Sequence, residues 1–170
     1  MLYKSVVAGL GEIGNPILQL ISKAGPTIGY DINDSLVDKT KYKKYANLKT
    51  MFLHMCIPFT DNFTKNVKTL YNKYKPQIIV IHSTISPYTT KNLQQMLSIP
   101  IIYSATRGVH KRMTHDLKRY TKFFSVYDDA PQAKWAAVEF TKLLKKCKVK
   151  TKKISTPVTL ELAKIVVDTS

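Results

Sequence analysis

Three glycines near the start of the chain form the pattern with the clearest chemical meaning. They follow an apolar run at 5–9 and open a helix-period segment, in the arrangement Gly9-x-Gly11-x-x-Gly14. In this context the first glycine permits a tight turn, the second lets backbone approach a pyrophosphate, and the third lets helix and strand pack closely. The helix N-terminus adds unpaired N–H groups and a partial positive charge. We therefore expect a dinucleotide pyrophosphate to be bound by Gly9, Leu10, Gly11, Glu12, Ile13 and Gly14.

An acidic residue follows at the distance that this motif requires. Asp31 ends the apolar run at 27–31, 22 residues after Gly9. A carboxylate there accepts hydrogen bonds from the adenosine ribose and repels a 2′-phosphate. No arginine follows it, so the pattern favours NAD over NADP. The alternative is that the glycines only shape a strand–helix turn and Asp31 only caps the next helix; having both elements in register favours the dinucleotide.

Apolar runs alternate with helix-period segments, and these elements must position the loop and the acid. Strands are expected at 5–9, 27–31, 50–58, 77–82, 101–104 and 123–127, with a weaker edge strand at 148–154. Helices are expected between them, including one around Met113, Leu117 and Tyr120. Continuous apolar strands separated by helices indicate a parallel sheet covered on both faces. The prediction is one doubly wound α/β domain over 1–155, ending in a C-terminal helix over 156–170.

Local patterns within the helices make further predictions. Thr60 or Asp61 is expected to cap the helix that carries Phe63. Residues 33–35 are expected to cap a short helix that runs to about residue 45. Apolar residues also predict one helix that carries Leu93, Met96 and Leu97, and another around Trp135, Ala136, Val138, Phe140, Leu143 and Leu144.

Composition bounds the class of protein. The chain has 170 residues, 44% of them hydrophobic, which is enough for a core and excludes a disordered chain. No run approaches the 18 or so apolar residues of a membrane span, and no signal-peptide pattern is present, so we expect no membrane association. Cys56 and Cys147 have neither metal-site nor disulfide-framework spacing, so no metal is predicted and a reducing cytoplasm is the expected location.

The net charge of +16 points toward a polyanionic partner such as nucleic acid. However, only three of the 27 basic residues are arginine, the side chain that base and phosphate recognition favours, and the lysines are spread along the chain. A solvated lysine-rich surface is therefore favoured over a nucleic-acid face.

Several segments together carry a family resemblance: Gly9 to Gly14, Asp31, Cys56-Ile57-Pro58 and His82-Ser83-Thr84-Ile85. They resemble the N-terminal NAD-binding domain of the 6-phosphogluconate dehydrogenase-like superfamily. The nearest branch is the UDP-glucose/GDP-mannose dehydrogenases, with 3-hydroxyisobutyrate and prephenate dehydrogenases further off. The resemblance implies that Ile57 and Pro58 lie against the adenosine, and that Ser83 and Thr84 lie near the nicotinamide and the substrate.

The same resemblance extends to the end of the chain. Residues 159–164, Thr-Leu-Glu-Leu-Ala-Lys, are similar to the start of the long helix that leads into a second, helical domain in these families. That domain completes the substrate site, and UDP-sugar dehydrogenases draw a catalytic Cys and Lys largely from beyond the first domain. Neither Cys56 nor Cys147 resembles that nucleophile. We therefore expect NADH binding but no turnover from these 170 residues alone.

Other polar residues are weaker candidates. Arg107 and His110 follow the run at 101–104, where a ligand crevice is expected; Arg107 could hold a carboxylate or phosphate of a small anionic substrate, and His110 could act as acid or base. The alternative is a loop arginine and a surface histidine. His54 and His82 are each expected to make a structural hydrogen bond rather than to act in catalysis.

The interpretation is an NAD-binding domain of a dehydrogenase that transfers hydride between NAD and a hydroxyl-bearing carbon. Ser83, Thr84, Arg107 and His110 are its candidate catalytic residues. The alternatives are a non-catalytic nucleotide-binding or regulatory module and a basic nucleic-acid-associated protein. Because seven of the ten residues from Val158 to Val167 are apolar, the last helix is expected to form a homodimer interface.

Overall fold

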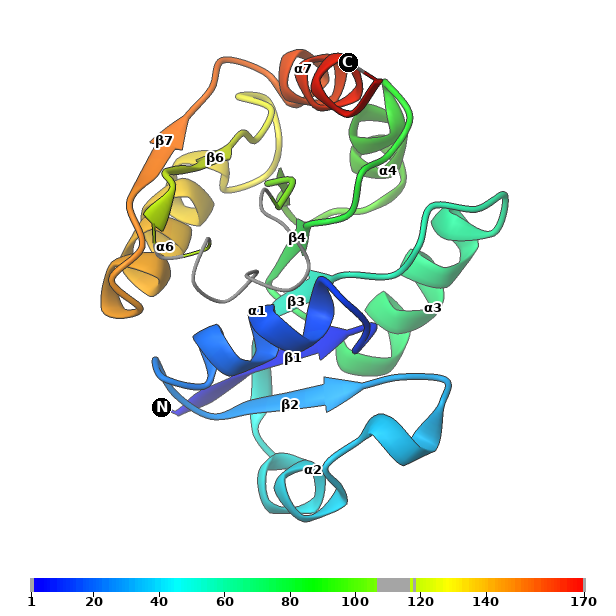
Figure 1. The fold of residues 1–170 in the computed structure, drawn as a ribbon, viewed down its shortest axis with the longest axis vertical. Helices are drawn as coiled ribbons and strands as arrows, with labels where there is room; N and C mark the ends of the chain where they lie inside the picture. Colours follow the sequence, from blue (N-terminus) through cyan, green and yellow to red (C-terminus); the bar gives the residue numbers. More distant parts are fainter. Residues whose placement is uncertain (1, 107–116, 118, 170) are drawn as a thin grey trace.

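The computed structural model describes residues 2–106, 117 and 119–169, with backbone alone for 165–169. Strands and helices alternate along the chain, as predicted (Figure 1). The strands are β1 (Tyr3–Ala8), β2 (Thr27–Tyr30), β3 (Lys49–Met55), β4 (Ile78–Ile81), β5 (Ile101–Tyr103), β6 (Lys122–Phe124) and β7 (Thr151–Lys153). The helices are α1 (Gly14–Ile21), the 3₁₀ turn η1 (Asp34–Leu36), α2 (Lys39–Tyr45), α3 (Phe63–Tyr74), α4 (Thr89–Met96), α6 (Ala133–Lys146) and α7 (Pro157–Thr169).

The main sheet has five strands in the order β2-β1-β3-β4-β5, and every pairing in it is parallel. From β1 the chain passes first to β2 on one side and then to β3 on the other. At such a reversal the connections leave in opposite directions and open a crevice at the carboxyl ends of the strands. The loops that follow β1 and β3 therefore flank the expected ligand site.

The last two strands depart from the predicted single sheet. β6 and β7 pair in parallel with each other and form a separate two-stranded sheet. An antiparallel bridge between Tyr103 and Ser125 is what joins this sheet to β5. The apolar pattern of 123–127 predicted the strand, but it carried no information about which edge the strand would pair with.

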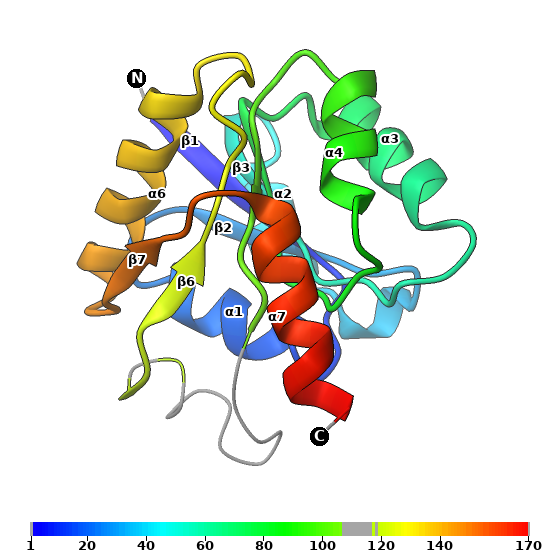
Figure 2. The same ribbon diagram turned by 90° about the horizontal axis from the view of Figure 1, so that it is seen from above.

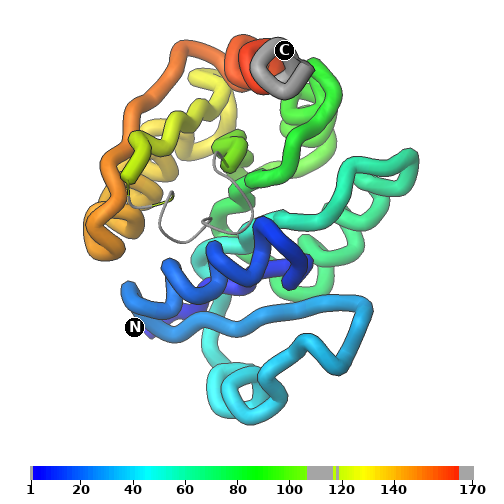
Figure 3. Tube along the Cα trace, viewed as in Figure 1, coloured from blue at the N-terminus to red at the C-terminus, as the bar shows by residue number. Residues whose placement is uncertain are grey.

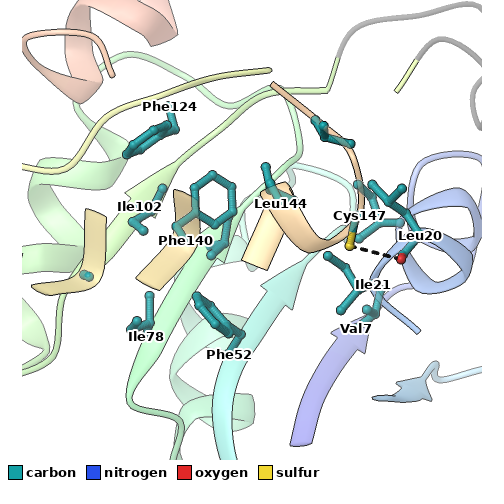
Figure 4. Packing of buried hydrophobic residues seen from close by; sticks show 14 of the residues in the cluster. Val7, Leu20, Ile21, Phe52, Ile78, Ile102, Phe124, Phe140, Leu144 and Cys147 are labelled. Atoms are coloured by element: carbon teal, nitrogen blue, oxygen red, sulfur yellow. Dashed lines mark hydrogen bonds between the residues drawn. The ribbon is translucent and has the colours of Figure 1, made fainter. Parts of the chain in front are cut away.

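The core lies in two layers, one on each face of the main sheet. Side chains of α1 and α6 pack on one face, where Phe140 contacts Phe52 and Phe124 (Figure 4). On the same face the Cys147 thiol donates a hydrogen bond to the Leu20 carbonyl oxygen, 3.3 Å away. Side chains of α3 and α4 form the core of the other face. Burial on both faces explains why the central strands are apolar at nearly every position.

One local prediction is wrong. The N-cap position of α3 is Asn62, not Thr60 or Asp61; Thr60 lies two residues earlier, and its hydroxyl accepts a hydrogen bond from the Asn62 N–H. In the predicted helices α4 and α6, Met96 and Val138 are 53% and 51% exposed.

Two other predicted helices remain: the short helix to Tyr45 and the helix around Met113 and Tyr120. The short helix to Tyr45 is split: Asn33 caps η1 and Asp38 caps α2 through their side chains. The expected helix around Met113 and Tyr120 falls largely outside the described residues.

Helix α7 packs beside α4, β5 and β6, although these elements are far apart in sequence (Figures 2 and 3). Its contact with α4 is polar. Glu161 is fully buried, and its carboxylate accepts hydrogen bonds from the Tyr88 N–H, the Thr90 N–H and the Thr90 hydroxyl at 2.9–3.1 Å. Burial raises the pKa of Glu161, while these hydrogen bonds oppose that rise. The carboxylate thus satisfies N–H groups that the start of α4 leaves unpaired.

Candidate functional site

Only glycine fits at two of the three glycine positions in the loop from β1 to α1. Gly9 has φ = +91°, and a Cβ there would lie 2.8 Å from the Cys56 carbonyl oxygen. A Cβ at Gly14 would lie 1.5 Å from the Gly9 carbonyl oxygen, which is a collision between backbone segments. These two residues therefore set the tight turn and the close approach of helix to strand, as the motif predicted.

Gly11 differs from both. A Cβ at Gly11 would meet no heavy atom within 4 Å, so the fold itself does not require glycine there. The helix that follows begins without a side-chain cap hydrogen bond at Ile13. An uncapped helix start beside open space is the arrangement that binds phosphate.

Asp31 lies just beyond β2 and ties the neighbouring loops together. Its Oδ2 accepts a hydrogen bond of 2.7 Å from the Leu10 N–H, and its Oδ1 accepts one of 2.8 Å from the Asn33 N–H. The expected alternative, a helix cap, is not its role, because Asn33 caps η1. Each carboxylate oxygen keeps a lone pair that a further donor can use.

A cavity of about 840 Å³ opens over the carboxyl ends of β1, β2, β3 and β4 and joins these features. That volume is in the range of cofactor and ligand sites. Nine of the residues predicted from sequence line it: Gly9, Gly11, Glu12, Ile13, Asp31, Ile57, Pro58, Ser83 and Thr84.

The remaining predicted residues lie elsewhere. Leu10 contributes its backbone N–H to Asp31 while its side chain is buried against Gly29, and Gly14 is buried in the packing of helix on strand. Neither lines the cavity. Arg107 and His110 lie outside the described residues.

Other cavity residues were not predicted. Asn66, Thr69 and Leu70 come from one face of α3, with the i, i+3, i+4 spacing of a helix. Ile32 is 94% exposed beside Asp31, and Phe59 and Thr60 extend the wall formed by Pro58. The spacing in α3 was visible in the sequence, but only the packing of α3 beside the β3 loop shows that this face borders the cavity.

Ser83 and Thr84 lie at the end of the cavity opposite Asp31. The Ser83 hydroxyl donates a hydrogen bond of 2.5 Å to the Ile57 carbonyl oxygen, which links the loops after β3 and β4. Thr84 is exposed and lines the cavity. Cys56 also lines it, but burial raises the pKa of its thiol to about 12, so the thiol stays protonated and is a poor nucleophile.

The two strand histidines form a buried pair, as the expected structural hydrogen bond requires. His54 Nδ1 and His82 Nε2 lie 2.8 Å apart. Burial is the main cause that lowers the pKa of His54 to about 3 and that of His82 well below its usual value. Both imidazoles are therefore neutral at physiological pH.

No three His, Cys, Asp or Glu side chains among the described residues gather closely enough to hold a metal ion. None of the described helices has an apolar stretch long enough to cross a lipid bilayer.

The sheet order, the glycine loop and the crevice at the strand reversal define a doubly wound α/β fold of the Rossmann type. No family model and no curated protein matches the sequence. Solved structures do match over nearly the whole chain. The UDP-D-ManNAc dehydrogenase of Pyrococcus horikoshii matches 98% of this chain with a TM-score of 0.76 and 16% identity.

Two other solved structures extend the comparison. The UDP-N-acetyl-mannosamine dehydrogenase of Staphylococcus aureus has a TM-score of 0.72 and 18% identity over 98% of this chain. The prephenate dehydrogenase of A. aeolicus, in complex with hydroxyphenyl propionate and NAD⁺, has a TM-score of 0.69 and 14% identity over 99% of this chain. This chain covers 50%, 50% and 69% of the three proteins, respectively, so it spans about half the length of the sugar-nucleotide dehydrogenases. The fold expected from the family resemblance is confirmed.

Proposed function

We propose that this chain is the NAD-binding domain of a dehydrogenase. The observation that carries the proposal is that one cavity is lined by Gly11, Asp31 and the Ser83-Thr84 pair together. These groups come from the ends of three different strands. Each matches the chemistry of a different part of a dinucleotide: pyrophosphate, adenosine ribose and nicotinamide.

The residues present fit the cofactor. Open space at Gly11, beside the uncapped start of α1, leaves room for the pyrophosphate against backbone N–H groups. Asp31 is held by Leu10 and Asn33 so that its remaining lone pairs are available to ribose hydroxyls. Ile32, Ile57 and Pro58 supply the apolar wall for the adenosine.

Bound nicotinamide supplies hydride transfer, and the chain's own residues orient the reactants and set the electrostatics. Ser83 fixes the loop after β4 by its hydrogen bond to the Ile57 carbonyl oxygen, and the exposed Thr84 lines the cavity at the proposed reacting end. We propose a substrate with a hydroxyl-bearing carbon and an anionic group. Arg107 and His110, outside the described residues, stay candidates for binding and proton transfer to that substrate.

Cofactor choice tests the proposal. We expect NADH to bind at least about tenfold more tightly than NADPH, because the Asp31 carboxylate repels a 2′-phosphate in the same place. Asp31→Ala should reduce this preference to about threefold or less, mainly by weakening NADH binding, since the substitution also releases the Leu10 N–H. Calorimetric titration of both variants with both cofactors measures the four affinities.

Asp34→Ala is the matched control, because Asp34 is an exposed carboxylate nearby whose ion pair with Lys39 lies at the surface. It should leave the preference unchanged. Equal affinity of the unmodified chain for NADH and NADPH would contradict the assignment of Asp31, and absence of binding to either would contradict the proposed function.

We further propose that the protein is a cytoplasmic homodimer joined through α7. Leu162 on α7 is 47% exposed, and seven of the ten residues from Val158 to Val167 are apolar, more than a helix needs to pack on one side. Both cysteines are free and buried, which fits a reducing compartment.

Light scattering at high protein concentration is expected to show a dimer, and Leu162→Glu to shift it to a monomer. Val138→Glu, at an equally exposed apolar position on α6, should leave the dimer intact. A strict monomer for the unmodified chain would overturn the interface.

A further inference from the structure

Lys122, the first residue of β6, is a lysine in the interior of the protein. It is only 6% exposed. Its Nζ donates hydrogen bonds to the Ser104 carbonyl oxygen at 2.8 Å and to the Thr106 hydroxyl at 3.3 Å. A protonated lysine has three donors, and no carboxylate of the described residues lies within ion-pair distance of this one.

A buried ammonium without a counter-ion is costly to maintain. Burial is the main cause that lowers the pKa of Lys122 to about 7, with a smaller contribution from Lys164. A Met side chain of similar length would fill the same space without this cost. A charge retained at such a cost is a candidate functional group, provided that the geometry places it near a site.

The geometry places Lys122 at the Ser83 end of the cavity. The Thr106 N–H donates to the His82 carbonyl oxygen at 3.1 Å, so the residue that Lys122 holds is bonded directly to the residue preceding Ser83. Lys122 also acts electrostatically on Cys56, which lines the cavity, and on both buried histidines. Its positive charge therefore contributes to the electrostatic potential at the end of the cavity opposite Asp31.

Among the described residues, the charged and titratable groups around Lys122 do not neutralise its charge. His54 on β3 and His82, just after β4, are neutral, and the Cys56 thiol stays protonated. Lys164 on α7 adds a second basic group, whose Nζ donates to the Thr106 carbonyl oxygen at 3.1 Å. Glu161, the buried carboxylate on α7, is committed to the start of α4.

We propose, on the basis of the proposed function, that Lys122 makes the site favour the reduced cofactor, NADH, over the oxidised cofactor, NAD⁺. The oxidised nicotinamide ring carries a positive charge, and the reduced ring is neutral. A protonated Lys122 repels the first and is indifferent to the second. Lys122 is thus a specificity-determining residue for the redox state of the cofactor, acting through its field rather than by contact.

The size of the effect follows from the strength of a single charge. A full charge within about 10 Å, in surroundings of intermediate polarity, shifts a binding equilibrium by about tenfold. Lys122 is partly protonated near neutral pH, and the cavity is open to solvent. We therefore expect the charge of Lys122 to increase the ratio of NADH affinity to NAD⁺ affinity by about threefold to tenfold at pH 7.

The experiment measures the NADH and NAD⁺ dissociation constants of the unmodified chain and of Lys122→Met by calorimetry at pH 6, 7 and 9. In Lys122→Met the ratio of the two constants should move threefold to tenfold toward NAD⁺ at pH 7. In the unmodified chain the preference for NADH should be largest at pH 6, where Lys122 is charged, and should fall as pH rises past 7. In Lys122→Met this pH dependence should disappear.

Lys152→Met is the matched control, because Lys152 lies in the partner strand β7 and is exposed to solvent. It removes one positive charge from the same small sheet and should leave the ratio unchanged. Thr106→Val removes an acceptor of Lys122 but keeps the charge, and should also preserve the NADH preference. A shift in Thr106→Val as large as that in Lys122→Met would mean that loop position, not charge, is responsible, and would overturn the inference.

Stability gives an independent measurement. The folded-state pKa of Lys122 lies below the value of about 10.5 for an exposed lysine, so the charged form destabilises the fold at low pH. Lys122→Met should raise Tm, more at pH 6 than at pH 9. If it unfolds the protein instead, Lys122→Gln provides the neutral variant for the binding measurement.

The two proposals fail in different ways. No binding of either cofactor by the unmodified chain contradicts the proposed function itself. Binding of both cofactors with a ratio that Lys122→Met and pH leave unchanged contradicts only the role of Lys122.

Discussion

Gly11→Val is expected to weaken NADH binding at least about a hundredfold while changing Tm little. The valine side chain would enter the open space beside the α1 N-terminus, where the pyrophosphate is proposed to lie, and would displace it from the backbone N–H groups. Because a Cβ at this position meets no heavy atom within 4 Å, we expect the substitution to leave the fold intact. Calorimetric titration with NADH and a thermal melt of the same sample measure the two effects.

Gly25→Val is the control for this substitution. A Cβ at Gly25 also meets no heavy atom within 4 Å, but Gly25 lies in the turn before β2 and does not line the cavity. It should bind NADH as the unmodified chain does. If Gly11→Val binds NADH with unchanged affinity, the pyrophosphate is not bound at this loop.

Gly14→Ala should have the opposite signature: a large loss of stability. A Cβ 1.5 Å from the Gly9 carbonyl oxygen cannot be accommodated without moving α1 away from β1, since both partners are backbone. We expect a loss of at least about 3 kcal/mol in the free energy of unfolding, which for a chain of this size lowers Tm by about 6–12 °C. Chemical denaturation and thermal melts measure it.

Gly11→Ala is the matched control, because it adds the same methyl group in the same loop without a collision. Its free energy of unfolding should change by less than about 1 kcal/mol. Unaltered stability in Gly14→Ala would show that helix and strand do not approach each other as closely as the structure has them.

The sequence alone was sufficient for the features that depend on neighbours along the chain. The glycine spacing marks a strand–turn–helix unit, and the period of the apolar residues identifies strands and helices because side-chain direction repeats locally. The position of Asp31 at the end of the second strand follows in the same way. These patterns predicted the doubly wound fold and five residues that line the cavity, Gly9, Gly11, Glu12, Ile13 and Asp31. The family resemblance supplied four more: Ile57, Pro58, Ser83 and Thr84.

Only the tertiary structure shows which residues and strands, distant in sequence, come together around the cavity and in the second sheet. The α3 face with Asn66 and Thr69 borders the cavity only because the parallel sheet sets α3 beside the loop after β3. The separate β6–β7 sheet depends on pairing partners that no local pattern specifies.

Charged residues show the difference most clearly. In sequence, Lys122 is one of many lysines, and Glu161 is one of three polar residues between Val158 and Val167. Charged side chains of both kinds are usually exposed to solvent. In the structure both are buried: Glu161 finds donors 71 and 73 residues away, and Lys122 finds acceptors 16 and 18 residues away. Strand and helix patterns depend on covalent neighbours, so the sequence determined the fold class and the glycine loop. Burial of a charge depends on partners brought together in space, so only the tertiary structure placed these two charged residues.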